Sequence, residues 1–79
     1  MNFLDAFIDE KIRKYYLMII RIDESNRGFI NKNVKYAVLR DKIRIFKIVI
    51  AVKKKHKFDF SDDLKRMNDL IVEAKKHRS

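Results

Sequence analysis

The sequence predicts an all-α fold, a three-helix bundle with a long central helix, and two observations favour this class. The 79-residue chain has no proline and one glycine, Gly28, so few residues interrupt a helix. Apolar residues also recur at steps of three and four residues along long segments, which is the spacing of one helix face. A chain of this length is expected to form one domain, 1–79, whose small core leaves its stability marginal.

The first segment predicts a helix that begins at an N-cap, Asn2, and runs to about Ile22. Its apolar stripe consists of Leu4, Ile8, Ile12, Tyr15, Ile19 and Ile22. Acidic residues come first and basic residues later, which complements the helix dipole. The cluster 23–28 predicts a turn in which Gly28 takes a positive φ, after which Phe29 and Ile30 pack back on the core.

A second helix is predicted from about Val34 to His56, with Asn31 or Asn33 as its cap. At 100° per residue its apolar residues form two flanks. One flank consists of Val34, Val38, Ile45, Val49 and Val52, and the other of Leu39, Ile43, Phe46 and Ile50. Eight of the ten residues in 43–52 are apolar, so this segment is either a central element or a surface kept for a partner. The competing interpretation is a β-hairpin of 34–39 and 42–52, because the second run is rich in Ile and Val.

A third helix is predicted to begin at an N-cap, Ser61, with Asp62 and Asp63 in its first turn, where negative charge is favoured. Its apolar stripe consists of Leu64, Met67, Leu70, Ile71 and Ala74. The helix ends among the cations of 75–78, which suit a helix C-terminus.

No pattern for catalysis, metal or cofactor binding is present, so we expect neither an enzyme nor a cofactor. Cysteine is absent, which excludes disulfides and thiolate chemistry. Asp62 and Asp63 point about 100° apart on a helix, so they suit an N-terminal turn better than paired acid–base chemistry. His56 and His77 have no ligand-spaced partner and are expected to be solvated.

The charge favours a polyanionic partner. Twenty Lys and Arg against eleven Asp and Glu give a net charge of +9, and nucleic acid is the commonest polyanion. Along the second helix, Arg40, Arg44, Lys47 and Lys54 fall on one ridge, followed by the basic run 53–57. The residues expected to contact phosphates are Arg40, Arg44, Lys47, Lys53, Lys54, Lys55 and Lys57.

The apolar excess predicts self-association. A homodimer is expected through Ile45, Ile48, Val49 and Val52. The alternative function is a protein-binding module, such as a phage-type inhibitor or an immunity-like protein, that docks on an acidic protein. A membrane surface is a less favoured partner, and 43–52 is shorter than the roughly 20 residues that span a bilayer. No signal peptide is recognisable at the N-terminus, so a cytoplasmic location is expected.

Overall fold

The computed structural model describes residues 3–28 and 31–77, and all three predicted helices are present. They are α1 (Phe3–Ser25), α2 (Lys32–Lys55) and α3 (Ser61–His77). The described residues contain no strand, and 34–52 is helical throughout, so the hairpin interpretation is wrong. The predicted cap Asn2 and the predicted packing of Phe29 and Ile30 lie outside the described residues.

The turn after α1 begins further along the chain than predicted. α1 continues to Ser25 because Asp23 and Glu24 do not break a helix, and its end is closed by Asn26. The Asn26 backbone N–H and side-chain Nδ2 both donate to the Ile22 carbonyl, at 3.2 and 2.8 Å. Gly28 has a φ of 93°, which confirms that this turn uses the conformational freedom of glycine.

Asparagine and aspartate side chains define the starts of the next two helices. The Asn33 backbone N–H donates to Asn31 Oδ1 at 2.8 Å, which identifies Asn31 as the cap of α2. Before α3, Asp59 Oδ1 accepts from the Ser61 backbone N–H at 3.0 Å and from its Oγ at 2.6 Å. These hydrogen bonds hold the pKa of Asp59 below its usual value. Ser61 is therefore the first helical residue and not the cap: the Phe60 carbonyl accepts the first helical hydrogen bond, from the Leu64 N–H at 2.9 Å, and the Asp59 carboxylate accepts from the Ser61 N–H.

The C-terminus of α2 ends in a Schellman motif built without glycine. The Phe58 N–H donates to the Lys53 carbonyl at 2.7 Å, and the Lys57 N–H donates to the Lys54 carbonyl at 3.3 Å. His56 is the C-cap, and Lys57 adopts the left-handed conformation with a φ of 62°. Phe58 then packs against the core, which supplies the apolar contact typical of this motif.

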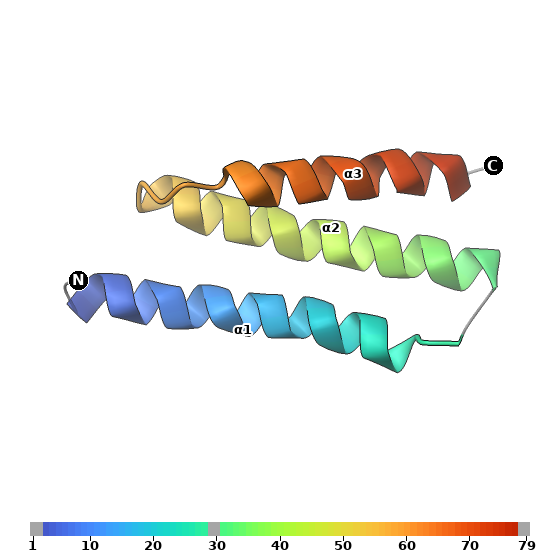
Figure 1. Cartoon of the computed structure of the whole chain (residues 1–79), viewed down its shortest axis with the longest axis horizontal. Coiled ribbons are helices and arrows are strands. Elements are labelled where there is room, and N and C mark those ends of the chain that lie inside the picture. Colours follow the sequence, from blue (N-terminus) through green and yellow to red (C-terminus); the bar gives the residue numbers. More distant parts are fainter. Residues whose placement is uncertain (1–2, 29–30, 78–79) are drawn as a thin grey trace.

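The three helices form an open array in which α2 lies between α1 and α3 (Figure 1). Within the described residues, no Cα of α1 comes within 8 Å of a Cα of α3, whereas α2 packs against both. The Cα atoms span 45 × 22 × 13 Å, with a radius of gyration of 14.1 Å. A compact domain of this length has a radius of gyration of about 11.6 Å, so the array is less closed than the predicted bundle.

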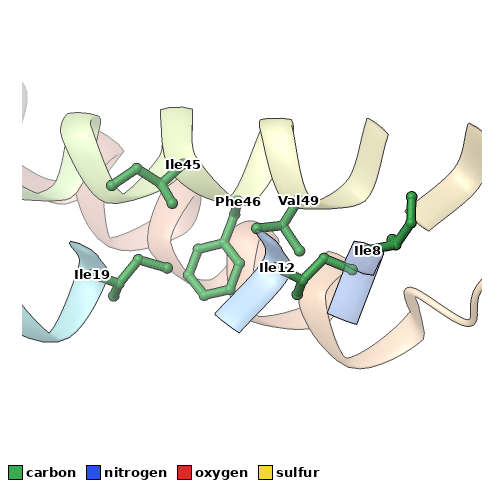
Figure 2. Close-up of a cluster of buried hydrophobic side chains, with 6 residues drawn as sticks. All are labelled: Ile8, Ile12, Ile19, Ile45, Phe46 and Val49. Carbon is green, nitrogen blue, oxygen red and sulfur yellow. The ribbon is translucent and has the colours of Figure 1, made fainter. Parts of the chain in front are cut away.

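The core lies between α1 and α2, where Figure 2 shows a row of six interlocking side chains. These are Ile8, Ile12 and Ile19 from α1 with Ile45, Phe46 and Val49 from α2. All nine residues of the two predicted flanks of α2 are buried or half-buried, which confirms that pattern. Leu4 and Leu64 depart from prediction, being 56% and 39% exposed, because both lie in the first turns of their helices, beyond close packing.

The apolar residues of α2 contact both neighbouring helices, and Phe46 of the second flank shares the α1 cluster with Ile45 and Val49 of the first. Ile45 and Val49 join the cluster that contains the α1 isoleucines, whereas Ile43 lines a shallow hollow with Ile71 and Ala74 of α3. The apolar excess of 43–52 is thereby explained by a central element with two packing partners.

The left-handed residue gives the first testable prediction. The left-handed conformation costs an L-residue about 1–2 kcal/mol, and glycine adopts it without that strain. Glycine instead loses about 0.5–1 kcal/mol of conformational entropy on folding. We therefore expect Lys57→Gly to raise the free energy of unfolding by up to about 1 kcal/mol, measured by urea denaturation.

The matched control is Lys55→Gly, within the last turn of α2, which should lower the free energy of unfolding by about 1 kcal/mol. A loss of stability in both variants would show that position 57 is not left-handed in solution.

Candidate functional site

The charge of the chain is concentrated on one helix. α2 contains nine Lys and Arg residues against one Asp, which gives +8 of the total +9. α1 contains four basic residues against five acidic ones, and α3 contains four of each. The positive potential around the molecule therefore originates mainly from α2.

Most of these cations lie on the side of α2 that neither neighbour covers. We define the α2 cationic face as five exposed residues: Arg40, Arg44, Lys47, Lys54 and Lys55. The only acidic residue of α2, Asp41, is half-buried. Within the described residues, no carboxylate lies within 4 Å of these five cationic groups.

Two residues assigned to phosphate binding from the sequence are placed elsewhere. Lys57 is exposed but lies beyond the end of α2, at the left-handed position of the loop. Lys53 is half-buried, and its ammonium group points into the protein, where it is bonded to side chains of α1 and α3. Five of the seven expected residues thus share one face, and Lys53 does not belong to it.

Lys53 forms part of a buried polar cluster, the Tyr16–Lys53–Asp63 triad, which takes one residue from each helix. Lys53 Nζ donates to Asp63 Oδ2 at 2.6 Å and to the Tyr16 hydroxyl at 2.9 Å. The Tyr16 hydroxyl donates to Asp63 Oδ1 at 2.5 Å. Lys53 Nζ also lies 5.5 Å from the centre of the Tyr16 ring, within the range of a cation–π contact.

The triad shifts two pKa values in the same direction. Burial raises the pKa of Tyr16, and its hydrogen bond to Asp63 adds to the effect more than Lys53 opposes it. Burial alone would lower the pKa of Lys53, but hydrogen bonds to Asp63 and Tyr16 outweigh burial and raise it. Both groups therefore keep their protons more firmly in the folded state than in the unfolded chain.

Asp63 shows that the triad is a structural link. It is 3% exposed and is the only side chain of α3 classed as buried among the described residues. Both of its oxygens are occupied, and the described residues contain no buried side-chain polar atom without a partner. A second lysine between the flanks of α2, Lys42, pairs with Asp23 of α1 at 3.0 Å. Through these two lysines α2 is bonded to side chains of both neighbouring helices.

The predicted partner interface is largely used inside the chain. Val49 is 0% exposed and Ile45 is 7% exposed. Both side chains are therefore already covered inside the chain, in the cluster that contains the α1 isoleucines. Val52 is half-buried against the same cluster. Ile48 alone of the four has a large free surface, at 43% exposure, and it borders the α2 cationic face.

The remaining candidates offer little chemistry. His56 and His77 are half-buried, where solvated side chains were expected. Residues 3–28 and 31–77 contain no group of three His, Cys, Asp or Glu side chains that could hold a metal ion. None of the described helices has the length and apolar character needed to cross a membrane.

Comparison of the chain with protein-family models, with curated proteins and with solved structures gave no match. The case for function therefore depends on the residues of this chain alone.

The triad was not predicted, although one signal for it was present in the sequence. Lys53 and Lys54 are neighbours in the chain but point about 100° apart on a helix. That angle puts Lys53 between the two apolar flanks and Lys54 on the opposite, charged side. The cations of the basic run 53–57 therefore cannot all lie on one surface of the helix. The identity of the partners, Tyr16 and Asp63, depends on helix packing that no local pattern specifies.

The triad generates the second testable prediction. Removing one member of a buried ion pair leaves an uncompensated charge and costs about 3–5 kcal/mol. We expect Lys53→Met to lower the free energy of unfolding by about 3 kcal/mol, at the lower end of this range because Lys53 retains some exposure. The double variant Lys53→Met/Asp63→Leu should recover most of the loss, because no buried charge remains. Urea denaturation of both variants in a double-mutant cycle measures the coupling.

The same cycle has a pH control. The pKa values of Tyr16 and Lys53 are raised in the folded state, above their usual 10.0 and 10.5. The protonated Tyr16 and Lys53 therefore stabilise the fold at neutral pH, and this stabilisation is lost as the pH rises through the raised pKa values. The double variant should lose less stability at alkaline pH than the parent protein. Additive single and double effects, with no change in alkaline sensitivity, would contradict the triad.

Proposed function

We propose that this protein binds nucleic acid through phosphate contacts made by the α2 cationic face, in a regulatory role without catalysis. The observation that carries the proposal is the exposure of five cations on one side of a helix that holds +8 of the net charge. Cations placed side by side repel one another, and a polyanion removes that repulsion while releasing its own counterions.

The geometry of the face suits a duplex. The residues between Arg40 and Lys55 rise about 22 Å along the helix, a length over which B-DNA presents many phosphates. The five side chains of the face are exposed, so a duplex backbone can approach them directly. With no base-reading pattern on the helix, the proposal extends to phosphate contacts and not to sequence specificity.

The alternative partner is an acidic protein. Exposed Ile48 and Ala51 lie among the cations of α2, and mixed apolar and Arg-rich surfaces are typical of protein interfaces. The homodimer expected from the sequence also remains a proposal, but the burial of Ile45 and Val49 moves its interface away from α2.

The third prediction tests phosphate binding. We expect duplex DNA or RNA to bind with an affinity that falls steeply with salt, each phosphate contact contributing about 0.9 to the log–log slope for B-DNA. Replacing Arg40, Arg44 and Lys47 together by Gln should flatten that slope by up to about three units, measured by fluorescence anisotropy over a salt series.

A matched control removes the same charge from α3 through Lys65, Lys75 and Lys76, which are exposed among acidic residues of their own helix. This control should change the slope much less. Equal slopes for the two triple variants would mean that charge acts only diffusely, and the absence of binding at about 50 mM salt would leave the acidic protein as the partner.

A further inference from the structure

One side of α1 combines exposed apolar side chains with cations and carries no acidic residue. We define the α1 arc as the exposed apolar and charged residues that lie within about 100° of one another around this helix. They are Phe3, Leu4, Phe7, Lys11, Lys14, Met18 and Arg21. Three of the four cations of α1 lie in the arc, and none of its five acidic residues does. Leu17 and Ile20 are also exposed, but they lie outside it.

The α1 arc and the α2 cationic face open on the same side of the array. Tyr16 bonds to Lys53 of α2 and Asp63 of α3, so the side of α1 that carries Tyr16 faces α3. The centre of the α1 arc lies about 170° from Tyr16 around its helix, and the centre of the cationic face lies about 150° from Lys53 around α2. Both surfaces therefore point away from the triad. Exposed Ile48 lies between the cationic face and Ile45, which packs with the α1 isoleucines, so Ile48 joins the two surfaces.

A single nucleic-acid strand matches both features of this side. Its phosphates match the cations, and the faces of its unpaired bases match exposed aromatic side chains such as Phe7, on which bases stack. A duplex keeps its bases stacked inside the helix. It would therefore cover the cations and leave the exposed apolar side chains without a partner.

The order of residues along the arc opposes other partners. Lys11 and Lys14 lie between Phe7 and Met18, and all four line one shallow hollow, which Glu10 borders from outside the arc. The core of a protein interface is depleted in lysine. Insertion of Phe7 and Met18 into lipid would carry two ammonium groups toward the acyl chains, at a large cost. Alternation of apolar and cationic residues instead suits a strand, because every nucleotide presents both a base and a phosphate.

We propose that the preferred ligand is a single-stranded nucleic acid that crosses from the α2 cationic face onto the α1 arc. There a base stacks on Phe7, and Lys11 and Lys14 contact phosphates. Packed helices lie about 8–10 Å apart, so a few nucleotides at about 3.4 Å each reach both surfaces. This inference rests on the proposed phosphate contacts of α2 and adds contacts that a duplex does not make.

The fourth prediction is measured by fluorescence anisotropy with the full chain. We expect oligothymidylate of about 16 nucleotides to bind more tightly than a duplex of the same length at equal salt. Phe7→Ser/Met18→Ser should weaken binding of the single strand about tenfold or more, because the loss of one stacked base costs roughly that factor. Binding of the duplex should change little. Circular dichroism checks that the variants stay helical.

The matched control is Leu17→Ser/Ile20→Ser, which removes apolar side chains that are 44% and 49% exposed on α1 but outside the arc. It should leave single-strand binding unchanged. A second pair tests the cations: Lys11→Gln should flatten the salt dependence of single-strand binding by about 0.7 in log–log slope. Arg13→Gln removes an exposed cation outside the arc and should leave the slope as it is.

Duplex binding as tight as single-strand binding, or equal losses in the two serine pairs, overturns the inference and leaves phosphate binding by α2 in place. Absence of binding by both forms at about 50 mM salt removes the proposed function itself. If Phe7→Ser/Met18→Ser instead keeps oligonucleotide binding and loses binding to phosphatidylserine vesicles, the α1 arc contacts a membrane and the inference is wrong.

Discussion

The structure depends on one constraint, which is that α2 must supply the packing surface for both other helices. α1 and α3 make no close backbone approach to each other within the described residues, so the backbone packing of both helices is against α2. Two flanks occupy nearly half of the helix circumference, and the rest of α2 is left for charge. The same division explains the apolar excess of 43–52 and the position of the α2 cationic face.

Two lysines of α2 form ion pairs with the neighbouring helices beside the apolar core. Lys53 meets Asp63 and Tyr16 there, and Lys42 meets Asp23, so lysines of α2 contact both neighbouring helices. A buried ion pair adds little net stability compared with apolar packing. Helix arrangements that separate its two charges are nevertheless destabilised, because each separation leaves a buried charge without a partner. In a small chain without disulfides, we infer that the triad fixes how α1 and α3 are placed relative to α2.

Local patterns predicted the helices well and the use of their surfaces less well. The nine apolar residues of α2 were identified because a 3.6-residue period is visible in the sequence. Whether Ile45 and Val49 met a second chain or α1 depended on tertiary packing, which periodicity does not encode. Lys53 was grouped with Lys54 because they are adjacent, although helix geometry separates them, and Asp63 was assigned only to the first turn of α3. The exposed apolar side chains of α1, such as Phe7 and Met18, do not stand out in the sequence, because 43–52 is the more apolar segment.

Residue-resolved hydrogen exchange by NMR tests the central role of α2 most directly. Amides that exchange only through global unfolding report the most stable part of a structure. The amides of Ile45, Phe46 and Val49 should exchange with the full free energy of unfolding, while those in the first turns of α1 exchange through smaller openings. If amides at the centre of α1, such as that of Ile12, were instead more protected than all of those in α2, α2 would not be the helix on which the other two depend.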